Sequence, residues 1–160
     1  MFFIRIFLIL IFVVFSNTVW AKKINRDAKE IYCLAQNIYF EARGEPENGQ
    51  FAVAAVTMNR VKSHKYPNTV CKVVWQHSQF SWTNDGKSDR PRNKRAWHRA
   101  RKIAYMVYSR YFTIQKKTHG AWDLTRGALH YYSPSIANPV WADKGTQSAV
   151  IGKHVFVAFN

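Results

Sequence analysis

Three glutamates lie within seven residues of this sequence, and one of them is placed where a carboxyl group would hold its proton. Glu41 lies near the expected end of a helix, beside the apolar residues Leu34 and Ile38. The negative end of a helix dipole and partial burial both disfavour a carboxylate, so the pKa of Glu41 should rise, as a general acid near neutral pH requires. Glu45 and Glu47 lie instead at the start of the next expected helix, where the dipole favours the charged form. The contrast selects Glu41 as the candidate acid, although a glutamate near a helix end is also typical of a solvated surface.

An amphipathic helix predicted over residues 25–42 positions this glutamate. Its apolar side chains recur at steps of three and four residues, which is the helical period. They are Ile31, Leu34, Ala35, Ile38 and Ala42. Pro46 fits the first turn of a second helix, predicted over residues 47–61. That helix is apolar nearly all round, so we expect it at the centre of the core.

The rest of the chain alternates short elements with turns. We expect a loop over 64–68, a short helix over 69–77, a polar loop over 81–93, a helix over 94–111 and short strands or extended segments over 128–132 and 155–159. The polar loop is longer than connections in compact domains usually are, which indicates a binding role. The expected fold class is mainly α, of the α+β kind, with small β elements.

Residues 1–21 have the layout of a secretory signal peptide. Arg5 precedes an apolar run of about ten residues, shorter than the roughly 20 that a membrane-spanning helix needs. Val19 and Ala21 suit cleavage before Lys22, and a retained N-terminal anchor is the alternative. We therefore expect an exported protein, periplasmic or extracellular, with one domain over residues 22–160 and no membrane span in the mature chain.

The mature chain is strongly basic. Beyond residue 21 it holds 23 Lys and Arg against 9 Asp and Glu, a formal charge of +14. Such an excess indicates a polyanionic environment: nucleic acid, an anionic membrane surface or an anionic cell envelope. Export makes nucleic acid the least expected of the three. The basic residues of the 94–111 helix are either a face that holds anionic envelope polymers or an ordinary solvated face.

Cys33 and Cys71 are the two cysteines of the chain. An even count in an exported protein is compatible with one disulfide, and two buried thiols are the alternative. Their spacing fits neither a redox motif nor a zinc motif.

Several blocks of the sequence carry a family resemblance. The run from Ala35 to Glu45, with Glu-Ala-Arg-Gly-Glu at its end, is followed by Gly49-Gln50, by the apolar run from Ala52 to Val56 and by Asn59-Arg60-Val61. Further blocks begin at Tyr66, Gln79, Ala128 and Ile151. Together they closely resemble the SleB/CwlJ-type cell-wall hydrolase family over nearly the whole mature chain.

The resemblance implies a lysozyme-like fold in which Glu41 cleaves peptidoglycan between N-acetylmuramic acid and N-acetylglucosamine. It also implies a lytic transglycosylase, in which one carboxyl first gives and then takes a proton, and no cofactor or metal is required. Glu45 matches the second glutamate of the family, as a supporting or substrate-binding residue. The alternative for Glu45 is the helix-start role given above.

A glycan groove requires aromatic platforms beside amides and hydroxyls. The candidates for substrate binding are Gln79, Ser81, Trp82, Tyr131 and Tyr132. Their alternative is core packing, because aromatics make up 16% of the chain.

Two other functions stay open. Six histidines would suit a zinc-dependent amidase that cuts the peptide stem, although none shows a His-x-x-x-His spacing. A non-catalytic binder of envelope polyanions would explain the charge but not the glutamate block. The expected partner is the peptidoglycan glycan strand, and the expected state is a monomer.

Overall fold

The first two predicted helices are present in the computed structural model, which describes residues 23–118 and 123–159. The N-terminal helix covers residues 23–42 and α2 covers Glu47–Lys62. A turn separates them, closed by the Glu45 N–H, which donates to the carbonyl oxygen of Ala42 at 2.9 Å. The expected signal segment, residues 1–21, lies outside the described residues. Among the residues described, no helix has the length and apolar character needed to cross a bilayer.

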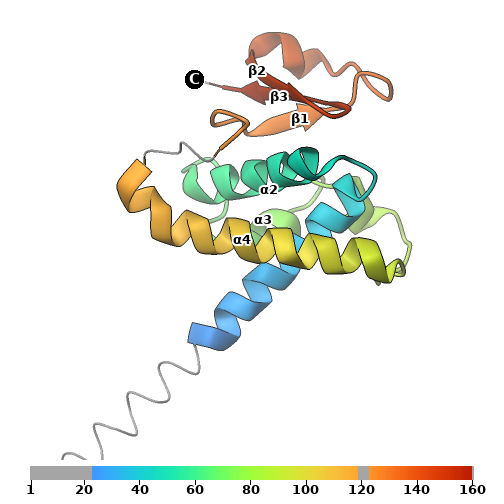
Figure 1. Cartoon of the computed structure of the whole chain (residues 1–160). Coiled ribbons are helices and arrows are strands. Elements are labelled where there is room, and N and C mark those ends of the chain that lie inside the picture. The colour runs from blue at the N-terminus through green and yellow to red at the C-terminus, as the bar shows by residue number, and fades with distance from the viewer. Residues whose placement is uncertain (1–22, 119–122, 160) are drawn as a thin grey trace, which may run out of the picture.

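Helix α2 lies between the other helices and a small sheet (Figure 1). One side of it packs through Ala54 and Met58 into the helical core. The other side packs through Ala52 and Val56 against Phe156 of the sheet. The prediction of a central helix that is apolar nearly all round is therefore confirmed.

Helix α3 covers Val70–Val74, shorter than the predicted 69–77. Thr69 caps its start by accepting a hydrogen bond from the Lys72 N–H at 3.4 Å. Its end comes early because the chain turns, with Ser78 at a φ of 61°. A disulfide joins Cys33 of the N-terminal helix to Cys71 of α3, with the two Cα atoms 5.2 Å apart.

The polar segment after α3 and the helix that follows both differ from the prediction. A 3-10 helix, η1, covers Ser81–Asn84, where we expected only loop. Helix α4 covers Lys94–Thr118, beyond the predicted end near residue 111. No glycine or proline occurs between residues 112 and 118, so the sequence gives no stop signal there.

The C-terminal part forms a three-stranded antiparallel sheet. Strands β1 (His130–Tyr132), β2 (Thr146–Ile151) and β3 (His154–Ala158) are arranged in the order β1-β3-β2, and a 3-10 helix, η2, covers Val140–Lys144. Two of these strands were predicted, whereas β2 was missed. It is a largely exposed edge strand with an irregularity between Gln147 and Ala149, so its apolar alternation is weak. The expected class, mainly helical with small β elements, is confirmed.

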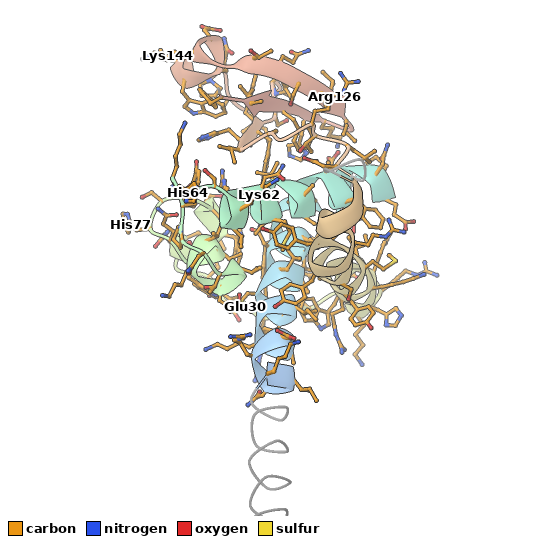
Figure 2. The ribbon with its side chains drawn as sticks, turned by 90° about the vertical axis from the view of Figure 1, so that its left-hand side faces the viewer. Glu30, Lys62, His64, His77, Arg126 and Lys144 are labelled. Atoms are coloured by element: carbon orange, nitrogen blue, oxygen red, sulfur yellow. A yellow bond between two sulfur atoms is a disulfide. The ribbon has the colours of Figure 1, made fainter. Side chains whose placement is uncertain are left out.

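Figure 2, turned by 90°, shows the same layering with the side chains drawn. Lys144 and Arg126 lie in the sheet layer, Lys62 at the end of α2, and Glu30 on the N-terminal helix on the far side of α2 from the sheet. Glu41 lies near the C-terminal end of this helix, where Tyr131 of β1 contacts it.

Candidate active site

Glu41 lies in the last turn of the N-terminal helix, and its side chain is directed toward the sheet. Its Oε2 accepts a hydrogen bond of 2.9 Å from the Tyr131 hydroxyl. Tyr131 is held in the middle of β1, where it pairs with Phe156 of β3. The candidate acid is thus fixed between two elements that are 90 residues apart in the sequence.

Three effects act on the proton of Glu41. Burial, the largest, raises the pKa of the carboxyl above its ordinary value of about 4.5. The hydrogen bond from Tyr131 and the positive charge of Arg60 both lower the pKa, and burial prevails. The carboxyl therefore keeps its proton to a higher pH than a solvated glutamate, while its two polar neighbours stabilise the carboxylate once the proton has left.

Arg60 is a buried cation whose charge acts on this carboxyl, and 5% of its surface is exposed. Its Nε donates to the carbonyl oxygen of Leu129 at 2.8 Å. The guanidinium carbon lies 5.2 Å from the ring centroids of both Tyr66 and Phe80. Within the described part of the chain, Nη1 of Arg60 has no hydrogen-bond partner. Arg60 thus fastens α2 to the start of β1 and brings a positive charge near Glu41.

The Tyr131 phenol stays protonated under ordinary conditions. Burial raises its pKa well above 10, and the neighbouring Glu41 raises it further. A protonated phenol can only donate to a carboxylate at this position. Tyr131 therefore acts as a fixed hydrogen-bond donor to Glu41.

Glu45 has a different environment from Glu41. Its Oε2 accepts the backbone N–H of Lys153 at 2.9 Å, in the turn between β2 and β3, and only 7% of its side chain is exposed. The same oxygen lies 3.9 Å from Nδ1 of His154, too far for a hydrogen bond. Burial lowers the pKa of His154, so this imidazole is neutral at neutral pH. Glu45 thus holds the hairpin in place.

The hairpin in turn supports the donor to Glu41. The His154 ring meets the Tyr131 ring edge-on, with 5.1 Å between centroids. Glu45 therefore supports Tyr131 indirectly, through the β2–β3 turn and the ring of His154.

Trp82, expected to be a sugar platform, lies largely in the core. It is 7% exposed, its Nε1 donates to Oδ1 of Asn37 at 3.2 Å, and its ring stacks on Phe40 at 4.7 Å. Trp82 and the exposed Ser81 next to it both line a cavity of about 720 Å³. The buried Asn37 also donates to Oγ1 of Thr57 on α2, at 3.1 Å.

The other two substrate-binding candidates, Gln79 and Tyr132, make contacts of a different kind. Gln79 is half-buried in a turn, where its backbone N–H donates to the carbonyl oxygen of Gln76 at 3.2 Å. Tyr132 follows Tyr131 in β1 and packs edge-on against Trp141 at 5.8 Å. Since successive side chains of a strand point to opposite faces, Tyr131 and Tyr132 cannot both face Glu41.

Sequence reasoning missed three residues of the site. Arg60, Asn37 and Phe40 lie within the family blocks, yet none of them was singled out. A signal for Arg60 was present, because this arginine lies within the helix predicted to be apolar nearly all round. No three His, Cys, Asp or Glu side chains within residues 23–118 and 123–159 form a group suited to a metal ion.

Comparison with known proteins adds to this geometry. Residues 44–157 match the family model described as Cell Wall Hydrolase. The matched range begins after Glu41, so the match does not bear on this candidate acid.

Relatives and solved structures agree with this match. The chain is 36% identical over 127 residues to the spore cortex-lytic enzyme of Bacillus cereus, covering 79% of this chain and 43% of that enzyme. It thus spans less than half the length of the curated relatives it matches. The crystal structure of the catalytic domain of the Bacillus cereus SleB protein superposes with a TM-score of 0.64 at 35% identity, covering 81% of this chain and 89% of that one. The catalytic domain of the germination-specific lytic transglycosylase SleB from Bacillus anthracis gives 0.63, also at 35% identity, covering 81% and 93%.

Proposed function

This chain belongs to the cell wall hydrolase family, and we propose that it is a lytic transglycosylase that cleaves peptidoglycan between N-acetylmuramic acid and N-acetylglucosamine. The observation that carries the proposal is the environment of Glu41: a buried carboxyl with a raised pKa that accepts a hydrogen bond from Tyr131. The similar catalytic domain from Bacillus anthracis, described as a lytic transglycosylase, supports the same reaction.

The first half of the reaction uses Glu41 as an acid. Its proton passes to the oxygen that links the two sugars, the bond from that oxygen to C1 of muramic acid breaks, and positive charge develops on the ring. Glu41 becomes a carboxylate at this moment. The Tyr131 hydroxyl at 2.9 Å and the charge of Arg60 stabilise that carboxylate, which burial alone would disfavour.

The second half uses the same carboxylate as a base. It takes the proton of the muramic acid 6-hydroxyl, whose oxygen attacks C1 and closes a 1,6-anhydro ring. No water is consumed and Glu41 ends protonated, as it began. Most glycosidases need a second carboxyl group. Glu45, the nearest acid in the sequence, is buried and bonded to the β2–β3 turn, which supports a mechanism with one carboxyl.

We also propose the place where this reaction happens. Residues 1–21 would direct export, and the domain over residues 22–160 would act on the wall in the periplasm or outside the cell as a monomer. The formal charge of +14 beyond residue 21 favours contact with anionic polymers of the envelope rather than with nucleic acid.

Mass spectrometry of the fragments released from purified peptidoglycan tests the reaction class. Fragments that end in 1,6-anhydromuramic acid are the expected result. Reducing muramic acid ends would show a hydrolase instead, and freed peptide stems would show an amidase. A complete lack of fragments would support a protein that only binds the wall.

A further inference from the structure

The first part of the N-terminal helix and the middle of α4 expose apolar and aromatic side chains to solvent. Ile24, Tyr32 and Tyr105 are 65%, 49% and 62% exposed. They line one hollow of about 630 Å³ between the two helices. Trp97 lines it as well, and its ring meets that of Tyr32 edge-on at 5.5 Å. Exposed apolar side chains that gather in one place mark an interaction surface, and the proposed reaction uses none of these residues.

Positive charges surround these apolar side chains. Arg101 lines the same hollow, and Lys23 and Arg26 line an adjoining hollow of about 600 Å³ that shares Ile31 and Tyr105 with the first. All three cations are exposed, and none has a carboxylate within ion-pair distance among the residues that the structure describes. The three cations and the three exposed apolar side chains together form what we call the basal patch.

The two acids on this part of the helix are bonded to the protein. Oδ1 of Asp27, which lines both hollows, accepts the Tyr108 hydroxyl at 3.0 Å. Oε2 of Glu30 accepts the backbone N–H of Cys71 at 2.9 Å. Both acids are half-buried, whereas the three cations are exposed. The charge that the basal patch presents to a partner is therefore mainly positive.

The combination of cations and apolar side chains indicates the kind of partner. A bilayer with anionic lipids offers an apolar layer beneath negatively charged headgroups, and tyrosine and tryptophan rings are favoured at that boundary. A hydrated polyanion would bind the cations but gain nothing from the exposed Ile24. A second copy of the chain would bring the same positive surface against this one. We propose that the basal patch binds the surface of an anionic lipid bilayer.

The basal patch and the candidate acid lie in different parts of the same helix. The patch surrounds the first part of the N-terminal helix, which in Figure 1 points away from the sheet. Glu41 lies 18 residues after Lys23. An α-helix rises 1.5 Å per residue, so about 27 Å of helix separates the two. A protein bound through the patch would keep Glu41 free for substrate, whichever bond Glu41 cleaves.

Co-sedimentation with lipid vesicles tests the proposal. The protein used is residues 22–160, because the apolar run before them would bind lipid by itself, and the contacts described above lie within residues 23–159. It should bind vesicles of phosphatidylglycerol and phosphatidylcholine in equal parts about tenfold more tightly than vesicles of phosphatidylcholine alone. Added salt should reduce this difference, because exposed charges are screened. Equal binding to the two kinds of vesicle, or no binding, would overturn the proposal.

Charge substitutions locate the binding surface. Lys23→Gln with Arg101→Gln should weaken binding to the anionic vesicles about 25-fold, since each cation near an anionic surface contributes about fivefold. The matched control is Arg126→Gln with Lys144→Gln, which removes the same charge from exposed residues of the sheet layer, on the other side of α2 (Figure 2). The control should change binding less than about twofold. An equal loss in both variants would show that only the total charge matters, and the basal patch would be wrong.

Apolar substitutions distinguish a bilayer from the other partners. Ile24→Ser with Tyr105→Ser should weaken vesicle binding about tenfold or more, because apolar area is no longer buried in lipid, and leave retention on immobilised polyphosphate unchanged. Vesicle binding that survives this variant would indicate a hydrated polyanion and overturn the proposal. A wild-type dimer that the variant dissociates would overturn it in favour of self-association.

Cleavage of soluble peptidoglycan fragments separates this inference from the proposed function. All the variants should release fragments at the wild-type rate, because the substituted residues lie away from Glu41. If the wild type releases no fragments but binds anionic vesicles through the basal patch, the membrane surface stands and the proposed reaction is wrong. If it cleaves normally and does not bind the vesicles, the reaction stands and the membrane surface is wrong.

Discussion

The turn between β2 and β3 offers a sharp test of how the hairpin is fastened to the site. Gly152 has a φ of +61°, and a Cβ added there would lie 2.1 Å from Oε2 of Glu45. That oxygen is the acceptor of the Lys153 N–H at 2.9 Å. A Gly152→Ala substitution must therefore push the carboxylate away and break its hydrogen bond, in addition to straining the backbone.

The structure gives the size of the effect. A non-glycine residue at this φ costs about 1 to 2 kcal/mol. A hydrogen bond to a charged, buried group contributes about 1.5 to 3 kcal/mol. Gly152→Ala should therefore lower the free energy of unfolding by about 2.5 to 5 kcal/mol, the sum of the two. In a Glu45→Ala background the carboxylate is already gone, so only the backbone cost of about 1 to 2 kcal/mol should remain.

Urea denaturation followed by tryptophan fluorescence would measure the four proteins of this double-mutant cycle. The expected coupling between Gly152 and Glu45 is about 1.5 to 3 kcal/mol, well above the additivity error of about 0.5 kcal/mol. Gly86→Ala is the matched control, since Gly86 has a φ of +70° and nothing within 4 Å of an added Cβ. It should show the backbone cost alone. Additive effects at Gly152 and Glu45 would refute this account of the hairpin.

Three further predictions follow from other contacts. Tyr131→Phe removes a hydrogen bond that lowers the pKa of Glu41. The high-pH limb of the kcat/KM profile should therefore move to higher pH. A limb that stays in place would show that Tyr131 does not act on this proton. Burial raises the pKa of Glu41 above about 4.5, so the folded protein binds that proton more tightly than the unfolded chain and loses stability as the pH rises through this range. Glu41→Gln should therefore resist urea better than wild type at pH 7, with the advantage vanishing below about pH 4.5, whereas equal stability at both pH values would contradict the burial argument. Replacing Cys33 and Cys71 by alanine opens a loop of 38 residues and should cost about 4 kcal/mol in urea denaturation, while a cost under about 1 kcal/mol would show that the link constrains little.

Local patterns predicted the helical part of the fold well. The apolar residues of 25–42 fall on one side of a helix, and those of 47–61 lie nearly all round one. Both helices are present with nearly those bounds. The strand β2 escaped notice because an exposed edge strand has no strong alternation to read. The end of α4 was misplaced because its sequence has no stop signal there.

The candidate site was predictable only in part. The helix position of Glu41 gave the direction of its pKa shift, which depends on local burial. The partners Tyr131 and Arg60 act across the fold, and no local pattern records which strand or helix will face a given side chain. Glu45 shows the same limit, because its hydrogen bond to Lys153 joins residues 108 positions apart.

The role of Glu41 is tested most directly by comparing Glu41→Gln and Glu45→Gln with wild type in release of 1,6-anhydromuramic acid fragments. Glutamine keeps the shape of each side chain and removes the proton that Glu41 must donate. The account predicts that Glu41→Gln releases no fragments above background while circular dichroism shows an intact fold, and that Glu45→Gln keeps a measurable share of the activity. Activity retained by Glu41→Gln would contradict the mechanism, and an equal loss in both variants would mean that the two carboxyls act together.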